Sequence, residues 1–367
     1  MRGLYIHVPF CVRKCRYCDF YSLPGQLDTV APYVDAVLRE SLTYKGLSSQ
    51  TMYLGGGTPS LLGAKHLKKL IDGLRESLDL SDVTEATIEV NPDSTTRELL
   101  ETAKDAGINR VSIGVQSLDD SELQSVGRVH TATQAMDAIK LTKRLGFNAV
   151  SADLIVGLPG QTWLTLHNSL ERLVDVGIEH LSLYCLSLEE GTPLAESPPD
   201  NLPSDDTQAE LFEQASRFLD GNRFIHYEIS NFALQGFECQ HNLIYWHGDE
   251  YLGLGPAAAS HLDGKRFRNR ADLDAYISHP TGQMEDVEEL FGEEKAAEEA
   301  MLRLRLLEEG IKIDELTAKF GQDNVTSLIA RLDGMVRDGR LTYDGSTYRL
   351  APARILTSNP IFADVLC

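Results

Sequence analysis

Three cysteines close to the start of the chain have the spacing that most clearly indicates chemistry. They form the pattern Cys11-x3-Cys15-x2-Cys18, directly after the first predicted strand. Three thiolates on one tight loop can hold three irons of a cubane [4Fe–4S] cluster, and the fourth iron is then open to another ligand. A structural zinc site with His7 nearby is the alternative, although zinc ligands commonly come as two separated pairs. The spacing therefore favours a cluster.

Polar and glycine residues at the ends of later predicted strands form a second group. Gly55-Gly56-Gly57-Thr58-Pro59 follows the second strand, and glycines let backbone groups approach a ligand closely, although a plain tight turn has the same pattern. Polar side chains stand at or just beyond the following strand ends, where α/β folds collect ligand-binding groups. These are Glu89, Gln116, Arg128 and Asp153. Taken singly, each also fits an ordinary polar residue at the end of a strand.

A histidine among large aromatic residues is the third group. The segment is His241-Asn242-Leu243-Ile244-Tyr245-Trp246. A histidine beside aromatic rings can supply an axial ligand and a flat apolar wall for a porphyrin. The residues alone favour a buried, hydrogen-bonded histidine in an aromatic core. Both interpretations remain open at this point.

The hydrophobic pattern predicts the elements that must position these residues. Short β-branched runs alternate with longer amphipathic stretches, which implies a parallel sheet with helical crossovers. The expected strands are Leu4–Val8, Thr51–Leu54, Ala86–Val90, Arg110–Val115, Val150–Val156 and His180–Cys185, and the expected helices lie near 30–45, 61–78, 95–106, 131–145, 163–176 and 205–221. Periodicity alone does not separate an open doubly wound sheet from an incomplete barrel.

The last third of the chain has a different pattern. Residues 224–270 look irregular, and from about residue 285 the sequence becomes acidic and helical. Helical stretches near 294–308, 313–320 and 323–338 precede a hairpin that turns at Asp344-Gly345, which predicts a small winged-helix-like α+β domain. We therefore expect three parts, at residues 1–200, 201–284 and 285–367.

Composition narrows the class of protein. The 367 residues carry a formal charge of −21, which opposes general binding to nucleic acid, and no apolar run is long enough to cross a membrane. The start of the chain turns polar too soon for a signal peptide. Six cysteines, three of them clustered, indicate a metal site rather than a secreted disulfide framework. We expect a cytoplasmic protein.

The cysteine spacing, in the context Tyr5-Ile6-His7-Val8-Pro9-Phe10-Cys11, resembles the radical S-adenosylmethionine (SAM) superfamily and, within it, the oxygen-independent coproporphyrinogen III oxidase family. The resemblance implies a partial (β/α)6 barrel, a [4Fe–4S] cluster on Cys11, Cys15 and Cys18, and an electron donor. It also implies SAM on the open iron, with Arg128 suited to pair with the methionine carboxylate. The positions that match the family's SAM contacts are Tyr5, Tyr17, Gly56, Gly57, Thr58, Glu89, Gln116, Arg128 and Asp153.

The segment His241–Trp246 looks like the signature of the haem chaperone (HemW-type) branch of that family. Two further features separate this chain from the oxidases, which carry an N-terminal extension and have a fourth cysteine where Phe20 stands here. The branch implies haem as a ligand with His241 as the first candidate to bind it, and delivery of haem to haemoproteins, including membrane-associated ones. A homodimer is also compatible with an exposed cluster. The alternatives are a coproporphyrinogen III dehydrogenase, which these differences disfavour, and a structural zinc protein.

Overall fold

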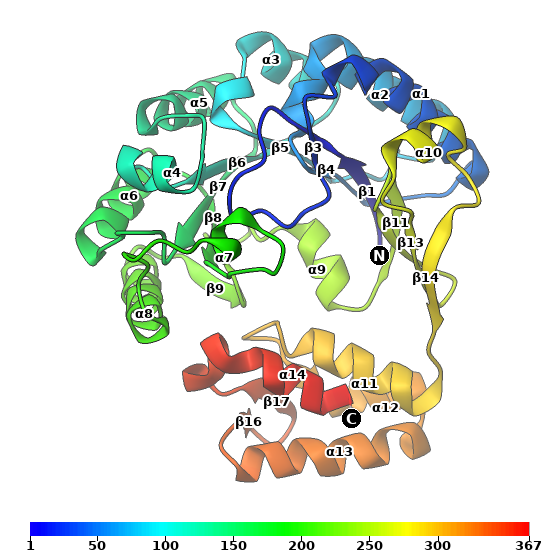
Figure 1. Cartoon of the computed structure of the whole chain (residues 1–367). Helices are drawn as coiled ribbons and strands as arrows, with labels where there is room; N and C mark the ends of the chain where they lie inside the picture. The colour runs from blue at the N-terminus through cyan, green and yellow to red at the C-terminus, as the bar shows by residue number, and fades with distance from the viewer. Residues whose placement is uncertain (367) are drawn as a thin grey trace.

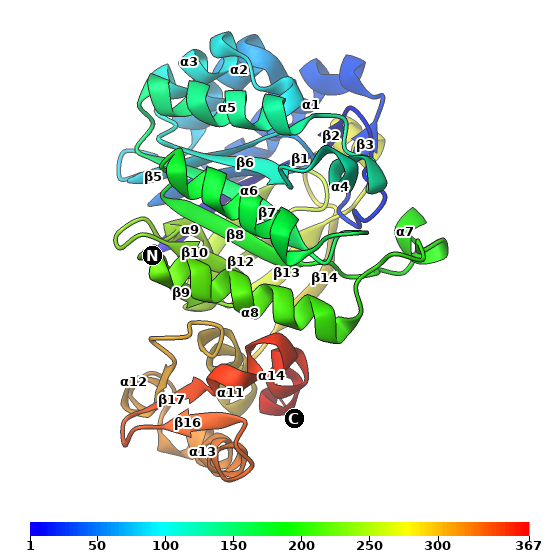
Figure 2. The ribbon, with the colours of Figure 1, turned by 90° about the vertical axis from the view of Figure 1, so that its left-hand side faces the viewer.

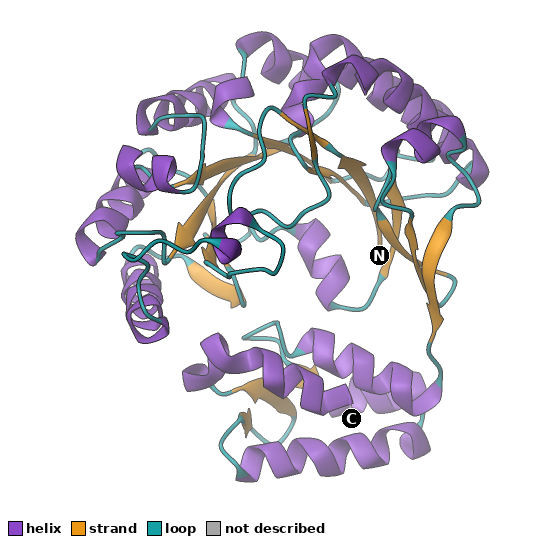
Figure 3. Ribbon diagram, viewed as in Figure 1, coloured by secondary structure: helices purple, strands orange, loops and turns teal. Residues whose placement is uncertain are grey.

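A computed structural model describes residues 1–366, so Cys367 lies outside the described residues. One large, strongly curved sheet carries helices on its convex side, and a smaller unit lies below it (Figure 1). The same arrangement is seen with the elements coloured by type (Figure 3). The sheet has twelve strands in the order β14-β13-β12-β11-β1-β4-β5-β6-β7-β8-β10-β9.

The centre of this sheet is parallel, and it confirms the predicted βα alternation. Each of its strands pairs in parallel with the next one in this list: β1 (Arg2–Val8), β4 (Thr51–Gly56), β5 (Glu85–Val90), β6 (Arg110–Gln116), β7 (Ala149–Val156) and β8 (His180–Cys185). The predicted helices between them are α1 (Val30–Ser41), α2 (Gly63–Ser77), α3 (Arg97–Asp105), α5 (Ala132–Leu145) and α6 (Trp163–Asp175), and α8 (Asp205–Gly221) follows the last strand. Short elements that were not predicted are β2 (Phe10–Cys11), β3 (Leu23–Pro24), α4 (Asp120–Ser125) and α7 (Pro193–Glu196).

The two faces of the parallel strands differ in chemistry. Side chains on the convex face, such as Leu4, Ile6 and Leu54, are fully buried in the main hydrophobic core. The alternate positions face the concave side, where Tyr5 pairs in register with Tyr53. In a closed (β/α)8 barrel the interior is packed mainly with branched apolar residues. Here the concave face is lined with polar residues and glycine, so it is suited to bind ligands.

Residues 224–289 extend the sheet on both sides, so the prediction that residues 224–270 are irregular was wrong. On one side β11 (Glu250–Leu254) pairs in parallel with β1, and β12 (Ala259–Leu262), β13 (Lys265–Asn269) and β14 (Met284–Glu289) continue antiparallel. On the other side β10 (Asn231–Ala233) and β9 (Ile225–Glu228) follow β8. Two short helices interrupt this region, α9 (Gln240–Trp246) and α10 (Leu273–Ser278).

The acidic segment that begins near residue 285 forms a strand at first, not the predicted helix. In the β13–β14 ladder Arg266 stands opposite Glu288, and Arg268 stands opposite Glu285. Opposite charges directly across a ladder stabilise strand pairing. The helical pattern was misleading here because these partners lie about twenty residues away in sequence.

The remaining residues form a compact unit with its own hydrophobic core, which extends from Ala296 to Val365. It contains α11 (Gly292–Arg303), β15 (Ile311–Lys312), α12 (Ile313–Phe320), α13 (Gln322–Arg337), β16 (Leu341–Tyr343), β17 (Thr347–Leu350) and α14 (Ser358–Leu366). Three helices beside the small sheet β15-β17-β16 make the predicted winged-helix-like arrangement, with α14 as an unpredicted addition. The three-part division stays a prediction; because β14 lies in the large sheet, we propose that this unit begins near Phe291.

The C-terminal unit contacts the edge of the large sheet and helix α9 (Figure 2). Arg305 lies between two aromatic rings, 4.9 Å from the centre of Trp246 on α9 and 4.6 Å from that of Phe362 on α14. His247, directly after α9, pairs with Glu309 at 2.9 Å.

Among the described residues 1–366, no helix is long and apolar enough to cross a membrane.

Candidate cluster and cofactor site

The N-terminal loop crosses the concave side of the sheet (Figure 1). Residues of this loop and of the carboxyl ends of the parallel strands line a cavity of about 390 Å³. The cysteine triad and all of the predicted SAM positions except Tyr5 line it. The lining includes Cys11, Cys15, Cys18, Tyr17, Gly56, Gly57, Thr58, Glu89, Gln116, Arg128 and Asp153. Residues separated by up to about 140 positions in sequence are therefore brought together in one cavity.

Backbone hydrogen bonds close the cysteine loop at its base and hold it in its middle. The amide of Leu23 donates to the carbonyl of Pro9 at 2.6 Å, and the amide of Arg16 donates to that of Val126 at 3.0 Å. The three cysteines are partly exposed. A single metal ion would need at least three converging His, Cys, Asp or Glu side chains, and no such group occurs in residues 1–366. A cubane cluster places its thiolates on separate irons, so it does not require this convergence.

The glycine segment passes directly beneath the start of the loop. The amide of Gly57 donates to the carbonyl of Val8 at 2.8 Å, and a Cβ at Gly57 would lie 2.6 Å from the carbonyl oxygen of Phe10. Gly56 has φ +107°, and a Cβ there would lie 2.6 Å from the His7 ring. Any larger residue would displace one of these neighbours, so the close approach of β4 to the loop requires glycine. The result is a backbone-lined wall without side chains, which fits a ligand that is recognised through main-chain groups.

Arg128 extends across the cavity floor towards the cysteine loop. Its Nη2 donates to the carbonyl of Gly114 at 2.7 Å and to Oδ1 of Asn91 at 2.8 Å, and its Nη1 lies 3.6 Å from Sγ of Cys15. Its buried Nε has no hydrogen-bond partner. The guanidinium is positively charged and lines the cavity beside the cysteine loop, so it is suited to pair with an anionic group of a ligand.

Two acidic side chains lie on the opposite wall. Burial and, to a smaller extent, the charge of Asp153 raise the pKa of Glu89 to about 7, and burial raises the pKa of Asp153 to about 6. The hydroxyl of Tyr53 donates to Oε1 of Glu89 at 2.8 Å, and the amide of Gly56 donates to Oε2 at 3.2 Å. Two carboxyl groups whose ionisation is opposed by burial favour a ligand that brings positive charge or hydroxyl donors.

Tyr5 and His241 lie below the cavity rather than in its lining. The Tyr5 hydroxyl is bonded to Nδ1 of His7 at 3.0 Å. His241 is only 1% exposed, its Nδ1 is 2.7 Å from Oγ1 of Thr51, and its Nε2 is 2.8 Å from the hydroxyl of Tyr245. Burial lowers its pKa to about 3, so the ring is neutral. Since both ring nitrogens already have partners, neither is free to ligate a metal in this conformation.

Comparisons with known proteins identify the family. The radical SAM superfamily model matches residues 5–173. Heme chaperone HemW of Lactococcus lactis subsp. lactis is 35% identical over 86% of this chain and 84% of its own length, and heme chaperone HemW of Bacillus subtilis is 33% identical over 100% and 99%. This chain belongs to the HemW family of radical SAM proteins.

A solved structure supports the fold assignment. Coproporphyrinogen III oxidase (HemN) from Escherichia coli, described as a radical SAM enzyme, superposes with a TM-score of 0.85 over 100% of this chain and 89% of its own, at 21% identity. The radical SAM superfamily implies a [4Fe–4S] cluster and SAM. The guanidinium of Arg128 fits the carboxylate of SAM, and the acidic groups fit its positively charged groups. The glycine wall fits a part of SAM that is bound through main-chain groups.

Some residues of the HemW-family cavity were not predicted from the sequence. Asn91 holds Arg128, and Tyr184 and Cys185, at the end of β8, line the cavity with exposed side chains. The sequence signal for Tyr184 and Cys185 was their position at the end of a predicted strand. Phe20, which stands where the oxidases have a fourth cysteine, also lines the cavity and is 63% exposed.

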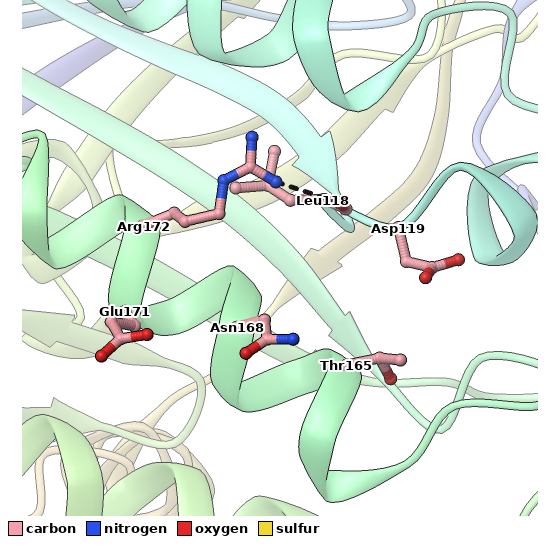
Figure 4. A pocket seen from close by; sticks show the side chains of 6 residues that line it. All are labelled: Leu118, Asp119, Thr165, Asn168, Glu171 and Arg172. Atoms are coloured by element: carbon pink, nitrogen blue, oxygen red, sulfur yellow. Dashed lines mark hydrogen bonds between the residues drawn. The ribbon is translucent and has the colours of Figure 1, made fainter.

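A second cavity, of about 230 Å³, lies between helix α6 and the loop after β6 (Figure 4). Arg172 closes one side of it through a 3.3 Å hydrogen bond to the carbonyl of Leu118 (Figure 4). Its other lining residues are Asp119, Thr165, Asn168 and Glu171. None of the predicted site residues borders it.

Proposed function

We propose that this protein is a haem chaperone that binds a [4Fe–4S] cluster, SAM and haem, and transfers haem to recipient haemoproteins in the cytoplasm. The observation that carries the proposal is the single cavity that joins the cysteine triad to the SAM positions. Its haem function is supported by full-length similarity to proteins named heme chaperone HemW. The net charge of −21 opposes a nucleic-acid partner.

In this proposal the cavity residues form groups that bind different parts of the cluster and of SAM. Cys11, Cys15 and Cys18 hold three irons and leave the fourth for the amino and carboxylate groups of SAM. Arg128 binds the SAM carboxylate, and Gly56 and Gly57 present backbone groups to the SAM amino group. Glu89, Asp153 and Gln116 bind ribose hydroxyls or the ammonium group. When bound and reduced by an electron donor, the cluster would supply the electron that reductive cleavage of SAM requires.

His241 remains the haem ligand that the family signature implies. In the described conformation it could bind iron only after its hydrogen bond to Thr51 or Tyr245 is broken. Recipient haemoproteins, including membrane-bound haem enzymes, and a homodimeric state are further parts of this hypothesis.

The test is an anaerobic haem titration of cluster-reconstituted protein, followed by absorbance. Wild type should bind haem stoichiometrically, and His241→Ala should bind it weakly or with an altered spectrum if His241 is the ligand. His226→Ala is the matched control, because His226 also stacks on an aromatic ring, that of Phe232, at 4.0 Å. Absence of specific haem binding by wild type contradicts the proposal.

A parallel incubation addresses the alternative activity. Wild type with reductant and SAM is supplied with coproporphyrinogen III under anaerobic conditions. The chaperone proposal predicts no protoporphyrinogen. Its formation would make the dehydrogenase the better description of this protein.

A further inference from the structure

A continuous set of contacts connects helix α9 with the acidic wall of the cavity. The ring of His241 stacks on that of Tyr53, with 5.1 Å between centroids and an interplanar angle of 25°. Tyr53 in turn donates its hydroxyl to Glu89 at 2.8 Å. Glu89 lines the cavity and Tyr53 does not. A residue of α9 is thus two contacts away from a ligand-binding carboxyl group.

Glu89 has few groups that hold it in place. Within the part of the chain that the structure describes, only Tyr53 and the Gly56 amide donate to its carboxyl oxygens, and the Tyr53 bond is the shorter. Tyr53 carries no other side-chain hydrogen bond among those described for residues 1–366. The position of its hydroxyl therefore depends on how its ring is packed. The neighbouring rings are those of Tyr5, at 6.3 Å, and His241, at 5.1 Å.

His241 is itself held rigidly. Besides the bonds of its two ring nitrogens, its backbone amide donates to Oε1 of Glu85 at 2.9 Å. Its ring also excludes any side chain at Gly3, where a Cβ would lie 2.9 Å from Cε1 of His241. The bonds of both ring nitrogens and the contact with Gly3 fix the orientation of the neutral His241 ring against Tyr53. A residue that only fills space in the core would not need so many fixed contacts.

We propose that His241 is a positioning residue for SAM binding, which it supports by fixing Tyr53 and, through it, the carboxyl group of Glu89. The proposal rests on SAM binding in this cavity, as proposed above. It gives the His241–Trp246 signature a task that needs no contact with haem. It also accounts for a histidine that is buried with both nitrogens bonded.

The first test measures the SAM dissociation constant of reconstituted protein by equilibrium binding. Tyr53→Phe keeps the ring and removes the donor, so SAM should bind about tenfold more weakly. His241→Ala should weaken binding by about threefold to tenfold, and the double variant should be no weaker than Tyr53→Phe within about twofold, because both changes act through one contact. His226→Ala should stay within about twofold of wild type.

Thr51→Val provides a second route, since it removes the hydroxyl that fixes Nδ1 of His241 while keeping the side-chain shape. It should weaken SAM binding by about twofold to threefold, even if His241→Ala does not fold. Unchanged affinity in Thr51→Val, or effects of His241→Ala and Tyr53→Phe that add fully, overturns the proposal. Failure of wild type to bind SAM overturns the proposed function instead.

A pH series separates positioning from general loss of structure. Glu89 faces the carboxyl of Asp153 and the hydroxyls of Tyr53, Tyr5 and Tyr184. Tyr53 lowers the pKa of Glu89 by donating to it, so its removal should raise that pKa. SAM affinity should fall as acid protonates Glu89. The pH at which half of the affinity is lost should therefore be higher than in wild type for Tyr53→Phe and His241→Ala, and unchanged for His226→Ala. A shared midpoint for all three proteins contradicts the proposal.

Discussion

The two ends of the concave face contain the same types of residue, but one end borders a cavity and the other is filled by a helix. At the carboxyl ends of the strands, Glu89, Asp153 and Arg128 border an open cavity, and Arg128 keeps a buried donor without a partner. At the opposite end, helix α9 fills the space, and Glu85 accepts from the amides of Gln240 and His241.

This difference shows what marks a binding end in such a fold. Polar residues line the whole concave face, so residue type alone does not distinguish the ends. The ligand-binding end leaves acidic groups and backbone bordering a cavity, whereas at the closed end the Glu85 carboxylate and both ring nitrogens of His241 bond to the protein's own groups. The following predictions should affect one end and spare the other.

The largest effect is expected from the cysteine triad. Cys15→Ser should lose the [4Fe–4S] cluster, so iron and sulfide should fall from about four atoms each per chain to well under half of that. The measurement is iron and sulfide analysis after anaerobic reconstitution. Cys185→Ser is the matched control, because Cys185 lines the same cavity outside the triad and should leave the iron content unchanged. Full iron loading in Cys15→Ser would contradict the assignment.

Arg128 is expected to have the next largest effect. Arg128→Met removes the guanidinium that faces the cavity, and SAM affinity should fall by about tenfold or more, because a charge-assisted contact is lost. Arg128→Lys keeps the charge without the planar fork and should be intermediate. Equilibrium binding to reconstituted protein measures both. Equal affinities in all three proteins would show that the carboxylate of SAM binds elsewhere.

Glu85 tests the closed end. Its carboxylate accepts from two amides at the start of α9, at 2.9 and 3.1 Å, and lies 3.9 Å from Arg110. Glu85→Gln should lower the free energy of unfolding by about 2 kcal/mol, because charge-assisted bonds at a helix N-terminus are weakened. Chemical denaturation measures this. The iron content should stay at the wild-type level. Loss of the cluster in Glu85→Gln would contradict the separation of the two ends.

A smaller effect concerns pH. In the folded protein Glu89 has a pKa of about 7, above its ordinary value, so folding favours its protonated form. The stability from this group is fully present below pH 4.5 and is lost as pH rises through about 7. Without SAM, wild type should lose more stability than Glu89→Gln between pH 5 and about pH 8. Thermal unfolding of both proteins measures this. If the stability of the two proteins depends on pH in the same way, Glu89 is more hydrated than its buried position indicates.

The sequence predicted the parallel core correctly, and the residues that it proposed for the cluster and for SAM lie together at the open end, except Tyr5. Both depend on local signals: alternating strands and helices, three cysteines on one loop, and polar residues at strand ends. The pattern brought Glu89, Gln116 and Asp153 to one edge because parallel strands end on the same side. Tyr184 and Cys185 had the same signal and were missed because no ligand chemistry was assigned to them.

The closed end could not be predicted because its contacts are distant in sequence. Strand β11 pairs with β1 across about 250 residues, and His241 meets Thr51 across 190. A short strand such as Glu250–Leu254 becomes recognisable only once its partner is in place. The location of His241 likewise depends on α9 entering the concave face, which nothing within the segment itself indicates.

The central claim, that the cysteine triad and the polar wall act as one site, has a direct test. Electron paramagnetic resonance of the reduced, reconstituted protein should be recorded with and without saturating SAM. If SAM binds the open iron in this cavity, the cluster signal of wild type should change on addition, and that of Arg128→Met should change only at much higher SAM concentration. A wild-type signal that stays the same at saturating SAM would contradict the account.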